Sequence, residues 1–289
     1  MPGFLIPFGA ALAAGLAVAR PLATACARVG FVDRPGGRKG HRAPVGLGGF
    51  LYALLLFPAL LERSLALALA AQAVFLLGLG EDLLKARGRE IPWPLRLTGF
   101  AAATAVLPIA DPGLFAATGS AAAAAALGLL FLATIHFNWL DHADGLAAAA
   151  ALGALLGIAT ASEPAANALG LPCGLLAAFL WLNGLRPGGP LLFLGDAGAQ
   201  LLGFGVVAIA LWPPQGAAAP SLWPALAVSA IPLGDAVRVT LQRIAQRVAP
   251  WRPDRERHLG HLAARARAPR PALPIAVGAA SFLLVLLAV

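Results

Sequence analysis

The sequence has little charge and almost no cysteine. Only 12% of its 289 residues are charged, whereas a soluble globular domain would carry roughly a quarter. Its two cysteines, Cys26 and Cys173, show no motif spacing, so neither a disulfide framework nor a cysteine zinc site is expected. The hydrophobic stretches are continuous rather than alternating, which excludes a membrane β-barrel. A helical membrane protein remains.

Hydrophobic residues make up 60% of the chain, and the mean hydropathy is +0.81. The apolar runs approach the roughly 20 residues that cross a bilayer as a helix. We therefore predict an all-α fold, a polytopic bundle of about ten transmembrane helices forming one domain over residues 1–289. The expected helices lie at 4–25, 47–61, 65–80, 97–110, 119–137, 146–161, 167–183, 197–213, 222–238 and 272–289.

The net charge of +8 would suggest a nucleic-acid partner in a soluble protein, but membrane topology explains it better. Nearly every Lys and Arg falls in alternate loops or at the adjoining helix ends, and Arg63 alone lies on the other side. The positive-inside rule then places these loops in the cytoplasm and both termini outside. We expect a multi-pass protein of the bacterial inner membrane, without nucleic acid, whose functional face is cytoplasmic. The basic loops are 26–46, 81–96, 138–145, 184–196 and 239–271.

Carboxylates recur where helices meet these loops. An ionisable residue at membrane depth is costly and is a functional hypothesis by default, although any single one is as well explained as a helix cap or a snorkelling side chain. Their position on one side, among many cations, favours a site for a divalent metal and a phosphorylated ligand. These residues are Glu81, Asp82, Asp141, Asp144, Asp196 and Asp235.

The first two basic loops each contain cationic side chains suited to phosphate. Lys39 and His41 lie in a Gly- and Pro-rich segment that predicts a fixed turn; they either grip phosphate or only anchor the topology. In the second loop, the adjacent carboxylates Glu81 and Asp82 suit Mg²⁺. Lys85, three residues beyond Asp82, serves either in a salt bridge or as a phosphate contact.

The third and fourth basic loops each add a motif. Asn138, Asp141 and Asp144 are spaced three apart, so one helical face would present them together. In the fourth loop a carboxylate, Asp196, stands in a Gly-flanked turn three residues after Phe193.

The last loop contains His258 and His261 at i,i+3, which would share a face and meet a pyrophosphate together with Arg255. As a zinc site this pair is weak, because no second ligand pair has suitable spacing.

Taken together and in order, these loops resemble the polyprenyl-phosphate N-acetylhexosamine-1-phosphate transferases of glycosyl transferase family 4. That family includes the GlcNAc-1-phosphate transferases and the phospho-MurNAc-pentapeptide translocases, and its members have ten or eleven helices. The resemblance spans about residues 30–262. It rests on Asp33-x-Pro35-x-x-Arg38-Lys39-x-His41, Glu81-Asp82-x-x-Lys85, Asn138-x-x-Asp141-x-x-Asp144-Gly145-Leu146, Phe193-x-Gly195-Asp196-x-Gly198, Pro232-x-x-Asp235 and Pro253-Asp254-Arg255 with His258 and His261.

The resemblance implies a Mg²⁺-dependent reaction, with Mn²⁺ as a substitute. A UDP-N-acetylhexosamine, by default UDP-GlcNAc, reacts with undecaprenyl phosphate to give a lipid-pyrophosphoryl sugar and UMP. Such a step opens a cell-envelope polysaccharide pathway such as that of lipopolysaccharide. A homodimer is one assembly that this interpretation allows.

The resemblance also implies roles for individual residues. Phe193 would stack on uracil, and Asn138 with Asp141 and Asp144 would hold the nucleoside or sugar. The implied catalytic carboxylates are Glu81, Asp82, Asp141 and Asp144; the metal ligands are Asp82 and Asp196; the substrate-binding residues are Lys39, His41, Lys85, Asn138, Phe193, Arg255, His258 and His261.

Three positions depart from the family pattern. Glu81 replaces the first of two aspartates, His142 replaces a glycine, and Gly260 stands where a histidine is expected, in a loop with one extra residue after Arg255. The longer side chain of Glu81 bears on metal geometry, because Mg²⁺ demands near-octahedral ligands.

Two other classes of membrane protein compete with this interpretation. A non-catalytic binder or transporter of polyprenyl phosphate or nucleotide sugar needs the basic face but not four carboxylate motifs, and a transporter also predicts broken helices at the midplane. A CDP-alcohol phosphotransferase would share Asp144-Gly145, but its later pair of aspartates is missing, since the chain is apolar from Leu146 to Glu163.

Overall fold

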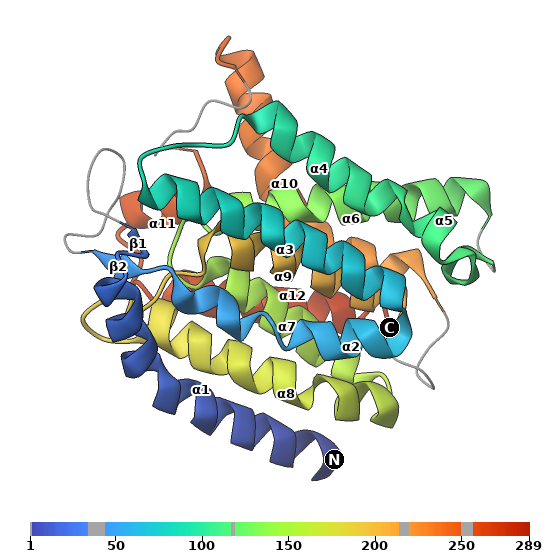
Figure 1. Ribbon diagram of the computed structural model, residues 1–289, viewed down its shortest axis with the longest axis horizontal. Coiled ribbons are helices and arrows are strands. Elements are labelled where there is room, and N and C mark those ends of the chain that lie inside the picture. The colour runs from blue at the N-terminus through green and yellow to red at the C-terminus, as the bar shows by residue number, and fades with distance from the viewer. Residues whose placement is uncertain (1, 34–43, 117–118, 214–219, 250–256) are drawn as a thin grey trace.

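The part of the chain that the structure describes folds into a bundle of helices with one short strand pair (Figure 1). The computed structural model describes residues 2–33, 44–116, 119–213, 220–249 and 257–289. Its elements are α1 (Pro2–Arg28), β1 (Val32–Asp33), β2 (Val45–Gly46), η1 (Gly48–Tyr52), α2 (Leu56–Arg63), α3 (Leu65–Ala86), α4 (Trp93–Ala105), α5 (Leu107–Ala110), η2 (Pro112–Phe115), α6 (Ser120–Leu140), α7 (Leu146–Thr160), α8 (Glu163–Leu180), η3 (Trp181–Leu185), α9 (Gly195–Leu211), α10 (Leu222–Ala245), α11 (Leu259–Arg265) and α12 (Ala272–Leu286).

Helix is present in every one of the ten predicted segments, which confirms the helical fold class. Within the described residues, five helices are long and apolar enough to cross a membrane: α1, α3, α6, α8 continued through η3, and α10. The apolar helices α7, α9 and α12 have 15 to 17 residues. At 1.5 Å per residue they reach about 23–26 Å, short of the ~30 Å hydrocarbon core. The chain is therefore a multi-pass membrane protein, and the count of ten spans stays a prediction.

Two of the predicted helices are wrong as continuous elements. The segment 47–61 divides into η1 and α2. The adjacent glycines Gly48 and Gly49 disfavour an α-helix at its start, where the Gly49 N–H bonds the Phe193 carbonyl (2.9 Å). The segment 97–110 divides into α4 and α5, and α4 begins earlier, at Trp93. Pro108 explains this second break, since proline lacks an N–H and its ring clashes with the carbonyl four residues before it.

Helix α9 lies at the centre of the bundle. From Ala197 to Leu211 each of its residues is buried, and it packs against α2, α3, α6, α7 and α10. A helix that is apolar on all sides is stable only when it is surrounded by others. The amino end of α9, which carries Asp196, is thereby held in a fixed place at one end of the bundle.

The polar loops gather at that same end. Figure 1 shows β1, β2 and α11 together at the left, whereas both termini lie toward the other side. The strands pair antiparallel, Val32 with Gly46, and Gly46 also bridges to Leu192. Backbone pairing thus ties the first loop to the segment that carries Phe193.

Candidate active site

A cavity of about 1870 Å³ opens at the loop-bearing end of the bundle, and residues from all five predicted basic loops line it. Loops far apart in the sequence therefore form one site, as the one-sided distribution of charge predicted. The charged, amide and imidazole side chains on its wall are Asp33, Asp82, Lys85, Arg87, Arg89, Glu90, Asn138, Asp141, His142, Asp144, Asn183, Asp196, His261 and Arg270.

Asp82 joins α3 to the amino end of α9. Its Oδ1 accepts a hydrogen bond from the Asp196 backbone N–H (2.9 Å), and its Oδ2 accepts one from the Ala197 N–H (3.0 Å). The first N–H groups of a helix have no partner within it and carry partial positive charge, so a carboxylate is well placed there. Gly195 permits this approach, since it has a φ of +73° and a Cβ there would lie 2.5 Å from Asp82 Oδ2.

Asp196 receives polar side chains from two other helices. Lys85 of α3 forms an ion pair with it and a second ion pair with Glu81 (2.9 Å). Asn138, near the end of α6, donates from Nδ2 to Asp196 Oδ1 (3.2 Å). Both Asp82 and Asp196, the predicted metal ligands, thus lie on the cavity wall with their positions fixed by hydrogen bonds.

Asp141 and Asp144 lie in the turn between α6 and α7, not on a helical face. Helix α6 ends at Leu140, and the turn closes at Gly145, whose φ is +80°. The prediction of one helical face was therefore wrong, although both aspartates line the cavity. Burial first, and then the charges of Asp196, Asp144 and Asp82, hold the pKa of Asp141 well above its usual range.

Glu81 has a different environment from its neighbour Asp82. Both of its carboxylate oxygens accept hydrogen bonds from Arg96 Nη1 (2.5 and 2.6 Å), and its side chain is 2% exposed. Among the described residues that line the cavity, Glu81 does not appear. A catalytic role for Glu81 stays a prediction, and the structure places its carboxylate in an ion pair with α4.

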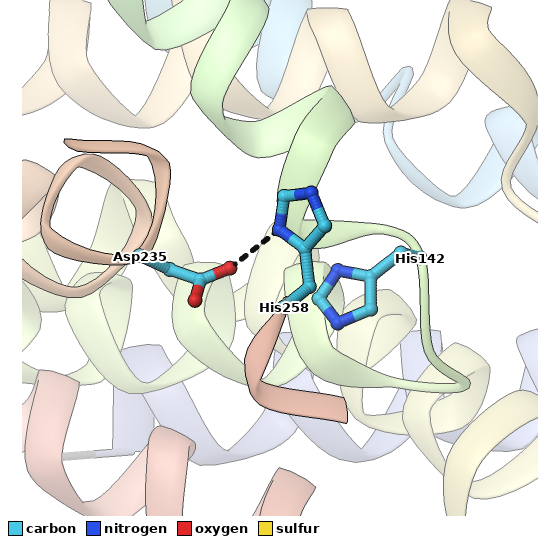
Figure 2. Close-up of side chains that lie close together, drawn as sticks. All are labelled: His142, Asp235 and His258. Atoms are coloured by element: carbon cyan, nitrogen blue, oxygen red, sulfur yellow. Dashed lines mark hydrogen bonds and ion pairs between the residues drawn. The ribbon is translucent and has the colours of Figure 1, made fainter. Parts of the chain in front are cut away.

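A second polar cluster lies beside the cavity and joins α10 to the last loop. Figure 2 shows Asp235 pointing at the ring of His258, with the His142 ring alongside. Asp235 Oδ2 is 2.8 Å from His258 Nδ1, Arg238 donates to its Oδ1 (2.5 Å), and the rings of His142 and His258 are 4.6 Å apart.

The ligand atoms of His142, Asp235 and His258 lie within 4.8 Å of one another, close enough to hold a metal ion. The hydrogen bonds and ion pairs that these residues already make disfavour metal binding. Both ring nitrogens of His142 are hydrogen-bonded, and Arg238 occupies Asp235. Arg243 also approaches His258 Nε2 at 3.5 Å. With two guanidinium groups nearby and the lone pairs engaged, the cluster serves as a hydrogen-bond network.

The remaining predicted site residues divide into two sets. Phe193 and His261 line the cavity, and His258 lies behind it as the N-cap residue of α11. Lys39, His41 and Arg255 lie outside the described residues.

Sequence reasoning did not single out Arg87, Arg89, Glu90, Asn183 and Arg270 on the cavity wall, and the last two have defined hydrogen bonds there. Arg270 donates from Nη2 to Asp144 Oδ2 (2.6 Å) and to the Asn183 carbonyl (3.2 Å). Asn183 lies in the π-helical turn η3 and donates to the Leu192 carbonyl (2.7 Å). Neither belongs to a recognisable motif, and only the π-helical turn, a feature often found at functional sites, marks the region. A π-turn is not readable from residue types.

The donor set of the cavity fits Mg²⁺. Mg²⁺ favours one or two carboxylates together with substrate phosphates and water, and Asp82 and Asp196 supply such carboxylates side by side. Each carboxylate oxygen has two lone pairs, so Asp82 retains acceptor capacity after it has bound two backbone N–H groups. Burial, and then repulsion by the neighbouring carboxylates, raises the pKa of Asp141, and a divalent cation would relieve that repulsion.

The sequence of this chain matches the model of glycosyl transferase family 4 over residues 64–213, just over half of its length. It is also similar to proteins named undecaprenyl-phosphate alpha-N-acetylglucosaminyl 1-phosphate transferase. The relative from Escherichia coli (strain K12) is 29% identical over 265 residues, covering 83% of this chain and 70% of that protein. The relative from Yersinia pestis is 29% identical over 286 residues, covering 87% and 73%. The Haemophilus influenzae relative is 42% identical over 91 residues, covering 30% and 25%.

Proposed function

Because the chain belongs to glycosyl transferase family 4, we propose that it transfers a sugar-1-phosphate from a UDP-sugar to undecaprenyl phosphate, releasing UMP. The names of the relatives favour GlcNAc-1-phosphate as the transferred group. The product is a lipid-pyrophosphoryl sugar, the starting unit of a cell-envelope polysaccharide.

One observation carries this proposal: carboxylates from three separate segments converge with a lysine on one cavity. Asp82 and Lys85 come from α3, Asp141 and Asp144 from the turn after α6, and Asp196 from α9. A binder of phosphate would need cations there, and a wall of repelling carboxylates would oppose it. A bound Mg²⁺ supplies the missing charge and orients phosphate oxygens.

The reaction is a phosphoryl transfer. An oxygen of the lipid phosphate bonds to the sugar-bearing phosphorus of the UDP-sugar, and the bond from that phosphorus to the oxygen of UMP breaks. UMP leaves with the bonding electrons. Such reactions depend chiefly on positioning and on stabilising charge on the phosphate oxygens.

Particular residues of this chain are suited to these tasks. Lys85 and Arg270 place cations on the cavity wall, where they would bind phosphate oxygens. Phe193 offers an aromatic face to uracil, and His261 a hydrogen-bonding group to the sugar or diphosphate. By the positive-inside rule the cavity faces the cytoplasm of a bacterial inner membrane, where UDP-sugars are available.

The test is UMP release by the purified protein in detergent with undecaprenyl phosphate and a panel of UDP-sugars, in Mg²⁺ or in EDTA. We expect release with UDP-GlcNAc that requires both lipid and metal. Asp196→Asn should abolish it. Asp111→Asn is the matched control, since Asp111 accepts a hydrogen bond from Ser64 (2.5 Å) and does not line the described cavity wall.

One outcome would overturn the proposed function, and another would change the assignment of the metal ligands. Folded protein that releases no UMP with any donor would favour the alternative, a non-catalytic binder or transporter of polyprenyl phosphate or nucleotide sugar. Full activity of Asp196→Asn would remove that residue from the metal site.

A further inference from the structure

Two of the positions that depart from the family motifs meet in space. His142 and Gly260 are 118 residues apart in the sequence, yet the Gly260 backbone N–H donates a hydrogen bond to His142 Nε2 (2.9 Å). The other ring nitrogen, Nδ1, lies 2.8 Å from the Trp139 carbonyl oxygen. An imidazole that donates to a carbonyl and accepts from an amide is the neutral tautomer with its proton on Nδ1.

The side-chain space at position 260 is taken by the imidazole of His142. A Cβ added to Gly260 would lie 2.8 Å from His142 Nε2, 3.1 Å from His142 Cδ2 and 2.5 Å from Ala143 Cβ. Real Cβ atoms essentially never lie within 3.0 Å of a non-bonded heavy atom, so a larger residue at 260 requires the imidazole to leave and Ala143 to shift. The imidazole of His142 thus occupies volume that a side chain at position 260 would need.

The same imidazole packs against both histidines of the last loop. Its ring centre is 4.6 Å from that of His258 and 5.3 Å from that of His261. His258 and Gly260 belong to the start of α11, none of whose seven residues is fully buried. A short helix with so little buried surface depends on a few specific contacts for its position.

We propose that His142 and Gly260 form a reciprocal pair, in which His142 supplies the imidazole that the family motif places at 260. His142 is then a positioning residue: it fixes the start of α11, and with it His261, against the cavity. The pairing itself rests on contacts alone; its consequence for catalysis rests on the proposed function.

A double-mutant cycle measured by thermal unfolding tests the pairing without any activity. His142→Gly leaves a void and a backbone N–H without its partner, and Gly260→His forces two imidazoles into one volume. We expect each variant to lower the melting temperature, and the combination H142G/G260H to lower it by clearly less than the sum of the two losses. The contact with Ala143 is present in G260H and in the double variant alike, so it cancels from the coupling. Losses that simply add would overturn the pairing.

Kinetics test the positioning role. In H142G we expect the KM for the UDP-sugar to rise about tenfold, the size of effect expected for a lost hydrogen bond and its packing, with a smaller change in kcat. H142G/G260H, or free imidazole added to H142G, should restore KM. An unchanged KM in H142G, or a failure of both rescues, would refute the positioning role. If the unaltered protein releases no UMP, the proposed function fails, whereas the unfolding cycle still decides the pairing.

Discussion

Replacing Gly195 by alanine should disrupt the junction between α3 and α9 on which the cavity is built. Gly195 has a φ of +73°, and an added Cβ would lie 2.5 Å from Asp82 Oδ2 and 3.1 Å from its Cγ. Because these are atoms of a short, 3% exposed side chain, the carboxylate must move away from the amino end of α9.

The expected cost has two parts. A non-glycine residue in the left-handed region costs about 1–2 kcal/mol. Displacing Asp82 breaks its hydrogen bonds to the Asp196 and Ala197 N–H groups, and bonds to a charged group contribute about 1.5–3 kcal/mol each. If the carboxylate keeps one of the two bonds, G195A loses about 2.5–5 kcal/mol of unfolding free energy.

Gly88→Ala is the matched control. Gly88 has the same φ of +73°, but nothing lies within 4 Å of the position its Cβ would take. It therefore measures the backbone cost alone, about 1–2 kcal/mol. Unfolding in mixed detergent and SDS micelles, followed by tryptophan fluorescence, gives both values. Equal losses in G195A and G88A would refute the reasoning, because the contact with Asp82 would then contribute nothing.

Three further changes give distinct outcomes. Glu81→Gln should lower the unfolding free energy by about 1–2 kcal/mol, less than a fully buried pair would cost because Arg96 is 29% exposed; loss of UMP release at unchanged stability would indicate a catalytic role instead. Asp141→Asn should raise the melting temperature in EDTA. Because the pKa of this carboxyl is higher in the folded than in the unfolded protein, its ionisation destabilises the fold as the pH rises from about 3.8 toward the folded pKa, and asparagine does not ionise. A gain in melting temperature that does not shrink at acid pH would contradict this. Arg270→Ala should raise the KM for the UDP-sugar about tenfold, since the cation beside Asp144 is lost, and an unchanged KM would exclude a substrate contact.

The sequence predicted the helices well because a helix that lies in a membrane requires a long apolar run, and such runs are visible in the sequence. It failed where backbone geometry intervened. At 47–61 the adjacent glycines were readable as residues that weaken a helix, but the hydrogen bond from Gly49 to Phe193 was not, since its partner lies far along the chain. At 97–110 the break at Pro108 was readable in principle, but the apolar run obscured it.

The predicted site residues were found by residue type and loop position, and the structure then brought most of those described to one wall. What the sequence could not supply was the pairing. Asp82 meets backbone groups 114 and 115 residues away, and Arg270 reaches Asp144 from 126 residues away. Hydrogen bonds between distant segments depend on how the helices pack, and no local sequence pattern encodes that packing.

The different contacts of the adjacent carboxylates Glu81 and Asp82 bear on which of them can hold a metal ion. Consecutive residues of a helix point about 100° apart, so the two side chains of α3 face different neighbours: Asp82 meets the amino end of α9, and Glu81 meets Arg96 of α4. The longer reach of Glu81 serves an ion pair with Arg96 of α4. Glu81 also shares Lys85 with Asp196, but it is not among the described residues that line the cavity. We infer that the replacement of aspartate by glutamate at position 81 leaves the geometry of a metal held by Asp82 and Asp196 unaffected. Glu81→Asp should accordingly weaken the pair with Arg96 and lower stability, while the Mg²⁺ concentration needed for half-maximal UMP release stays the same; a shift in that concentration would return Glu81 to the metal site.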